Sequence, residues 1–300
     1  MNPHLSKNAK YGRWQSLGLT FMAYVMAYMA AVLTFRQFEY LGDIWGILIA
    51  DVAATLIIFF LGLLVHNASL YDPYWSVVPV GIAGYWWYLS DYSIDDIRNV
   101  LLMIVLMYWA IRLTVNWIRG WPGLVHEDWR YQMLRKANGD FYPLVNLGGI
   151  HLLPTVLVFL GMIPAYFVLS EDGGPLNMWD YAAFIIGMIA VTIEFVSDEQ
   201  MKSFTSNPAN KGKVMDQGLW KYSRHPNYLG EILFWVSIFL FAIAVSTSYL
   251  WTGIGVLSMV ILFVFGSIPM MDNRSKERRP EFKDYMERTS SLLLLPPRQK

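Results

Sequence analysis

The stretch Gly218–Val245 reads GLWKYSRHPNYLGEILFWVSIFLFAIAV and joins a polar motif directly to a long apolar run. The apolar part is long enough to cross the roughly 30 Å hydrocarbon core of a bilayer as a helix. Arg224, His225 and Glu231 therefore stand at the mouth of a predicted spanning helix, where charged groups are costly unless they are paired or functional. We expect the rest of the chain to bring this motif to the membrane surface or to complete a pocket with it.

Apolar residues dominate the whole chain of 300 residues. The hydrophobic fraction is 55%, the charged fraction is 15% and the mean hydropathy is +0.36. Because apolar runs of spanning length recur, the sequence predicts an all-α polytopic membrane protein with no soluble domain. The expected spans are about 15–35, 44–64, 74–90, 100–117, 148–169, 179–196, 228–247 and 249–270. The third run is short, and the number of spans is seven if it does not cross.

The positive charges predict the orientation of these spans. If the N-terminus is cytoplasmic and the spans alternate, nearly all of the 23 lysines and arginines fall on the cytoplasmic side. The loops on the other side carry acidic residues such as Asp96 and Glu171. The positive-inside rule favours this arrangement, so we expect both termini in the cytoplasm.

Composition also excludes several classes of function. A net charge of zero gives no indication of a nucleic-acid partner. The absence of cysteine excludes disulfides, thiolate chemistry and cysteine metal sites. The five histidines show neither HxH nor HExxH spacing, so no metal site is expected. No GxGxxG motif follows a strand, which excludes a Rossmann domain and leaves helix ends and loops to hold any nucleotide.

The polar motif has the features of an anion site. Pro226 suits the first turn of a helix, where its missing N–H would be unpaired in any case. The start of that helix offers N–H groups and the positive end of the helix dipole, and Arg224 and His225 add positive charge. This combination suits a phosphate or pyrophosphate. A single arginine here would be explained by the positive-inside rule, but the whole cluster favours a function.

Asn227 and Glu231 lie four residues apart and therefore share one face of the predicted helix, with Tyr228 beside them. Glu231 lies about one turn further into the membrane. Its carboxylate can accept hydrogen bonds from a ribose or an amide, or it can pair with an arginine.

The motif SRHPNYLGE, preceded by GLW-x-Y, resembles the signature of the DUF1295 branch of the steroid 5α-reductase-like membrane reductases. The segments EFVSDEQ at 194–200, HEDWRYQMLRK at 126–136 and GSIPMMDNRSKERRPEFKDYMERTS at 266–290 are similar to that branch too. The similarity covers roughly residues 66–290, so we expect an N-terminal hairpin at 1–65 and a membrane domain at 66–300. The Arg-His-Pro at 224–226, which the mammalian steroid enzymes lack, follows the bacterial and sterol-reductase pattern. We expect the chain in the inner (plasma) membrane of a bacterium.

The resemblance implies NADPH in a cytoplasm-facing cavity and reduction of an activated carbon–carbon double bond. Phosphate recognition favours arginine and lysine, so basic residues near the motif are added as candidates, although each is equally explained as a solvated charge. In the mammalian enzymes an asparagine stands where this chain has Glu194, and no role is carried over to it. The predicted cofactor-binding residues are Asp198, Lys211, Tyr222, Arg224, His225, Asn227, Tyr228, Glu231, Arg274 and Arg278.

The resemblance implies a substrate end as well. Asp72 precedes the VPVG run at 78–81, and Tyr108 follows on the next predicted span. The implied role of Asp72 and Tyr108 is an acid pair that grips the carbonyl oxygen of a lipophilic, steroid- or isoprenoid-like enone. Trp109 is an alternative for the tyrosine position. A hydroxyl oriented by Asp72 would stabilise the enolate charge that develops as hydride attacks.

Two other readings of the chain are open. Isoprenylcysteine carboxyl methyltransferases carry a version of RHPxYxG, so an S-adenosylmethionine-dependent membrane methyltransferase is the alternative enzyme. A lipid-binding or transport protein is the non-enzymatic alternative, although no internal repeat of the kind found in transporters is visible. Asn227 followed by Glu231, together with the EFVSD segment, favours the reductase, with membrane lipids and a lipophilic substrate from the bilayer as partners.

Overall fold

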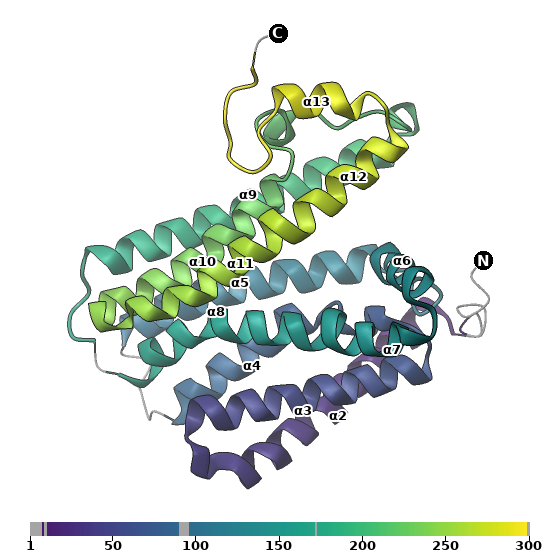
Figure 1. Ribbon diagram of the computed structural model, residues 1–300. Helices are drawn as coiled ribbons and strands as arrows, with labels where there is room; N and C mark the ends of the chain where they lie inside the picture. The colour runs from purple at the N-terminus through teal and green to yellow at the C-terminus, as the bar shows by residue number, and fades with distance from the viewer. Residues whose placement is uncertain (1–7, 9–10, 90–95, 172, 299–300) are drawn as a thin grey trace. The chain divides into compact units, whose positions relative to one another are not determined.

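The computed structural model describes residues 8, 11–89, 96–171 and 173–298. Over these residues the chain is helical without a named strand, which confirms the predicted all-α class (Figure 1). One isolated bridge pairs Ser223 with Ser290 in this part of the chain.

Nine helices carry most of the part of the chain that the structure describes. They are α2 (Arg13–Phe38), α3 (Asp43–Leu64), α4 (Tyr74–Leu89), α5 (Ile97–Gly120), α8 (Leu153–Ser170), α9 (Met178–Ser206), α10 (Pro226–Val245), α11 (Ile254–Ile261) and α12 (Ile268–Arg278). Shorter α-helices are α6 (Trp129–Asn138), α7 (Tyr142–Val145) and α13 (Phe282–Arg288). Short elements connect these helices, among them the 3₁₀ turns η3 (Ala68–Tyr71), η6 (Pro208–Asn210) and η7 (Gly218–Lys221) and the π-helix η5 (Asn146–Leu152).

Among the described residues, seven helical segments are long and apolar enough to cross a membrane, by length and composition. They are Arg13–Leu41, Asp43–Leu64, Ile97–Gly120, Trp129–Ser170, Met178–Ser206, Pro226–Val245 and Thr247–Arg278. Large apolar side chains such as Phe21, Phe60 and Phe265 are exposed on them, as expected of surfaces that face lipid. The chain is therefore an integral membrane protein.

The predicted third span is a helix, but it is not one of the seven. α4 has 16 residues, which corresponds to about 24 Å and falls short of the hydrocarbon thickness. Residue 90, the last of that predicted run, lies outside the described residues. The other seven predicted runs each match one of the seven segments.

The chain forms two compact units. Unit 1 comprises Met1–Asp91 and Ala110–Tyr166, and unit 2 comprises Tyr92–Trp109 and Phe167–Lys300. Helix α5 contributes its first half to unit 2 and its second half to unit 1. The hairpin predicted at 1–65 corresponds to α2 and α3, which pack along each other within unit 1.

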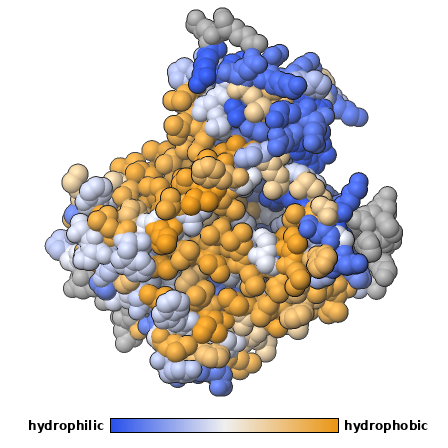
Figure 2. Space-filling view, viewed as in Figure 1, coloured by the Kyte–Doolittle hydropathy of each residue, from blue (hydrophilic) through white to orange (hydrophobic). Residues whose placement is uncertain are grey.

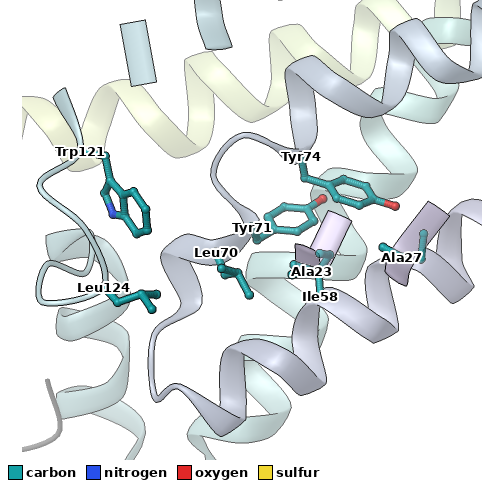
Figure 3. Close-up of a cluster of buried hydrophobic side chains, with 9 residues drawn as sticks. Ala23, Ala27, Ile58, Leu70, Tyr71, Tyr74, Trp121 and Leu124 are labelled. Carbon is teal, nitrogen blue, oxygen red and sulfur yellow. The ribbon is translucent and has the colours of Figure 1, made fainter. Parts of the chain in front are cut away.

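The core of unit 1 gathers small residues of α2 and α3 with aromatic residues from the following connections. The side chains labelled in Figure 3 are Ala23, Ala27, Ile58, Leu70, Tyr71, Tyr74, Trp121 and Leu124. The two alanines leave room for α2 to approach its neighbours closely. Asn67 ties two connections together, because its Nδ2 donates to the carbonyl oxygens of Leu124 and His126, each at 2.9 Å.

In unit 2, α9 and α10 run side by side and touch at Gly230 (Figure 1). A Cβ atom at Gly230 would lie 2.7 Å from the carbonyl oxygen of Ala190 and 2.4 Å from Cγ of Glu194. Only glycine permits so close an approach of the two backbones. Further along, the Ser237 hydroxyl donates to the carbonyl oxygen of Ala183 at 2.7 Å. These contacts fix the start of α10, which carries the polar motif, against α9.

A buried ion pair joins the starts of α5 and α9 within unit 2. Arg98 Nε lies 2.7 Å from Asp180 Oδ1, and the two side chains are 1% and 0% exposed. Arg98 also donates to the carbonyl oxygens of Gly174 and Pro175, while Asp180 accepts the backbone N–H of Asn177 at 2.8 Å. Both charges are therefore paired and hydrogen-bonded, which is what burial of a charge requires.

Replacing one member of this pair should strongly destabilise the protein. We expect Arg98→Met to lower the free energy of unfolding by about 3–5 kcal/mol, because it leaves the Asp180 carboxylate buried and uncompensated. Equilibrium unfolding in mixed detergent micelles measures the change. The matched control is Arg288→Met in the exposed pair Arg288–Asp216, 2.7 Å apart and 44% and 39% exposed, which should cost about 0–1 kcal/mol. Equal losses for the two variants would contradict the assignment.

Candidate cofactor site

Helix α10 begins at Pro226, as the sequence predicts, with His225 at the N-cap position and without a side-chain cap. The turn before it is anchored on α9. Gly218 has φ +57°, and the N–H of Leu219 donates to Oε1 of Gln200 at 2.9 Å. Glycine suits this positive φ, and a Cβ at Gly218 would lie 2.5 Å from the Gln200 amide, which would have to shift.

Asp272 of α12 is the partner of both Arg224 and His225 in the motif. Arg224 Nη2 lies 2.8 Å from Asp272 Oδ2, and His225 Nε2 lies 3.0 Å from Oδ1. The Asp272 side chain is buried, and the Arg224 guanidinium also donates to the carbonyl oxygens of Thr289, at 2.6 Å, and Met286, at 3.3 Å. Arg224 is thus engaged within unit 2, and its predicted contact with a cofactor phosphate stays a prediction.

The segment after α13 folds back onto the motif. The Arg224 N–H donates to the carbonyl oxygen of Ser290 at 2.9 Å, and the Ser223 hydroxyl donates to that of Leu292 at 2.7 Å. From α13, the Tyr285 hydroxyl donates to the carbonyl oxygen of Trp220. Burial raises the pKa of Tyr285 further above its ordinary value near 10. On unit 2, Figure 2 shows hydrophilic residues gathered around this end, where α12 and α13 lie in Figure 1.

Glu231 lies one turn into α10 and receives two indole donors. Nε1 of Trp109 lies 3.0 Å from Oε2, and Nε1 of Trp235 lies 3.0 Å from Oε1. The Glu231 side chain is 8% exposed, and the Trp109 ring stacks on Phe234 with ring centroids 4.3 Å apart. Each carboxylate oxygen can accept a further hydrogen bond. The indoles therefore hold the carboxylate in place without using all of its acceptor capacity.

Asn227 lies on the same face of α10, one turn before Glu231. Its Oδ1 is buried and has no hydrogen-bond partner among the described residues. Beside it, the Tyr228 ring stacks on His225, with centroids 5.2 Å apart and an angle of 5° between the ring planes. The structure thus places two buried acceptor groups, from Asn227 and Glu231, on one face of α10. We call this surface the acceptor face.

All ten predicted cofactor residues belong to unit 2. Asp198 is half-buried on α9. Tyr222 is exposed, and its backbone carbonyl oxygen accepts the N–H of Leu295 at 3.2 Å. The remaining basic residues differ in exposure, because Arg274 is half-buried on α12 whereas Arg278 at its end and Lys211 after η6 are exposed.

The two predicted substrate residues lie in different units. In unit 1, half-buried Asp72 accepts a hydrogen bond at 2.8 Å from the hydroxyl of Tyr131. Burial raises the pKa of Asp72 from its ordinary 3.8 to about 7, although the Tyr131 hydrogen bond acts in the opposite direction. In unit 2, the Tyr108 hydroxyl lies 3.4 Å from Oγ1 of Thr192, whereas the alternative, Trp109, is fully buried against Glu231.

Three partners in the candidate site were not predicted from the sequence. They are Asp272, which pairs with Arg224, and the indoles of Trp109 and Trp235, which donate to Glu231. Trp235 follows Glu231 by four residues, so helical spacing could have found it. Asp272 stands at the end of the last apolar run, and a carboxylate at such a place calls for a partner. No group of three or more His, Cys, Asp or Glu residues that could hold a metal ion occurs in the described part of the chain.

The family model of DUF1295, described as a protein of unknown function, matches residues 58–289. The chain belongs to the DUF1295 family. It is also similar to an uncharacterized protein from Schizosaccharomyces pombe, with 27% identity over 245 residues that cover 74% of this chain and 71% of the relative. None of the solved structures matches it. The matched range contains both the acceptor face and Asp272.

Neutralising Asp272 should release the segment that folds back on the motif. Asp272→Asn removes the charge that pairs with Arg224 and His225, so we expect faster amide hydrogen exchange over residues 286–298 and over 218–229. Hydrogen exchange followed by mass spectrometry measures it. Asp216→Asn, which removes an exposed carboxylate bonded to Arg288 of the same end, is the control and should leave these rates nearly unchanged. Unchanged protection in the Asp272 variant would show that Asp272 does not hold the segment.

The raised pKa of Asp72 predicts a pH dependence of stability. Between about pH 4 and pH 7 the folded state binds this proton more tightly than the unfolded state does, so the free energy of unfolding should fall as the pH rises. The slope from one group is at most about 1.4 kcal/mol per pH unit and vanishes above pH 7. Asp72→Asn should flatten this part of the unfolding profile, whereas Asp140→Asn, at an exposed site of the same unit, should not. A profile unaffected by Asp72→Asn would contradict the raised pKa.

Proposed function

We propose that this DUF1295 protein is an enzyme that reduces an activated carbon–carbon double bond of a lipophilic enone with NADPH. The observation that supports the proposal is the acceptor face of α10. Asn227 Oδ1 is a buried acceptor without a partner among the described residues, and Glu231 keeps acceptor capacity beyond its two indole bonds. A buried acceptor that is left unpaired is costly, so a ligand that brings N–H and O–H donors would be bound favourably here.

NADPH carries such donors in its carboxamide and ribose groups and would supply the hydride when bound. The start of α10, which has no side-chain cap, offers the positive end of the helix dipole to its phosphates. Among the predicted basic residues, Arg278 and Lys211 are exposed and Arg274 is half-buried on α12. These three are the candidates for binding the phosphates. The residues of unit 2 therefore fit the chemistry of the cofactor.

The reaction adds a hydride to the β-carbon and a proton to the α-carbon of the enone, and negative charge develops on the carbonyl oxygen in between. Hydrogen-bond donors aimed at that oxygen lower the barrier. The family resemblance implies Asp72 and Tyr108 for this role, and the assignment stays a prediction. The apolar exposed surfaces of the spanning helices suit a substrate that arrives from the bilayer.

Cofactor binding by the detergent-purified full chain tests the proposal. We expect wild-type protein to bind NADPH in equilibrium dialysis, and Asn227→Leu and Glu231→Gln each to weaken binding by roughly tenfold, the effect of losing one hydrogen bond to a buried group. Val236→Ala, a half-buried position further along α10, is the matched control and should leave the affinity unchanged.

S-adenosylmethionine is titrated in parallel, because its ribose and ammonium donors would also suit the acceptor face. Binding of S-adenosylmethionine without NADPH would overturn the reductase in favour of the methyltransferase. Binding of neither would overturn the cofactor site altogether and favour a lipid-binding or transport protein.

A further inference from the structure

A second polar cluster lies buried in unit 1, outside the proposed cofactor site. Its central residue is His151 on the π-helix η5, with a side chain that is 0% exposed. Nδ1 of His151 lies 3.1 Å from the carbonyl oxygen of Asn146. A carbonyl oxygen only accepts hydrogen bonds, so Nδ1 must carry the proton and Nε2 of the neutral ring presents a lone pair. Nε2 is buried and has no hydrogen-bond partner among the described residues.

The backbone around His151 is unusual as well. A π-helix is rare, and short π segments within helices occur frequently at functional sites. Asn146, at the start of the same segment, is 3% exposed, and its Oδ1 is a second buried acceptor without a partner in the described part of the chain. Buried polar groups in folded proteins are nearly always paired, so two unpaired acceptors on one short segment call for an explanation.

Hydroxyl groups line the neighbourhood of this histidine. The ring of Tyr71 lies against that of His151, with centroids 4.6 Å apart. The Tyr71 hydroxyl lies 2.7 Å from Oγ1 of Thr155, which in turn lies 2.8 Å from Oγ1 of Thr55. These hydroxyls are therefore already engaged with one another. None of these contacts involves Nε2 of His151, which can therefore accept a hydrogen bond from another molecule.

A second tyrosine, Tyr74, is the next member of the cluster. Tyr74 stacks on Tyr71, as Figure 3 shows, with ring centroids 4.9 Å apart, and donates to Asp51 Oδ1 at 2.6 Å. The other side chains beside His151 are apolar, since Phe59 meets its ring edge-on with ring centroids 5.3 Å apart and Ile150 is buried. Apolar neighbours together with an unused lone pair favour a molecule that is largely hydrocarbon and carries an O–H donor.

We propose that His151 Nε2 accepts a hydrogen bond from the hydroxyl group of a lipophilic alcohol bound within unit 1. The inference does not depend on the proposed reductase activity, because every residue that carries it belongs to unit 1. A saturated hydrocarbon lacks the donor, and an ether of the same shape has an oxygen that cannot donate. The hydroxyl hydrogen itself is what the site recognises.

Farnesol and its methyl ether are the probes, since they differ only in that hydrogen and its replacement by a methyl group. Tritiated farnesol is bound to the full chain in lipid nanodiscs, and each unlabelled compound competes for it. We expect wild-type protein to prefer farnesol over the ether by roughly tenfold, the effect of one hydrogen bond to a buried acceptor.

Variants test whether His151 causes the preference for farnesol over its ether. His151→Phe keeps a planar ring but has no acceptor, so the preference should fall to about onefold, whereas His151→Gln retains an acceptor and should recover part of it. Ser76→Ala, which removes another buried hydroxyl of unit 1, is the control and should keep the full preference. Thermal unfolding of each variant identifies any that fail to fold.

Two results would overturn the proposal. Equal competition by farnesol and its ether in wild-type protein does so without any variant and would indicate that Nε2 meets only a buried water. A full preference that persists in folded His151→Phe would show that the hydroxyl is recognised elsewhere.

Discussion

The polar motif at the start of α10 depends on one group, the carboxylate of Asp272. It lies between the guanidinium of Arg224 and the imidazole of His225. Arg224 also donates to the carbonyl oxygens of Met286, within α13, and of Thr289, directly after it. One buried acid thereby joins α12, the turn before α10 and the returning segment. Charges in so apolar a protein are costly unless paired, and here the pairing also determines the geometry of the motif. Asn227 and Glu231 project from a helix start that is held from three directions.

Local chemistry in the sequence was enough to predict the helices and the start of the motif. Pro226 marks the first residue of α10 because its ring fits a helix start, and apolar runs mark the spans because the bilayer sets their length. The i, i+4 relation placed Asn227 and Glu231 on one face. The short α4 was the exception among the spans, since its composition is that of a spanning helix and only its length is not.

Contacts across long sequence separations could not be predicted. Arg224 looked like a free cation for a phosphate because Asp272, its partner, is 48 residues away, and no periodicity connects the two. The same holds for Trp109, which lies 122 residues from Glu231. The pairing of Asp72 with Tyr131 follows from the fold of unit 1 and not from any motif. The sequence thus predicted residues of the candidate site but not the partners that these residues have in the structure.

The returning segment also sets an order of events during synthesis. Leu292, whose carbonyl oxygen receives the Ser223 hydroxyl, follows Ser223 by 69 residues. The motif and all of α10 are therefore synthesised before the carbonyl groups that complete their hydrogen bonding. Until then the polar groups of the turn must be satisfied by water or lipid headgroups. The hydrogen bonding of the motif is consequently completed only after α13 has been made.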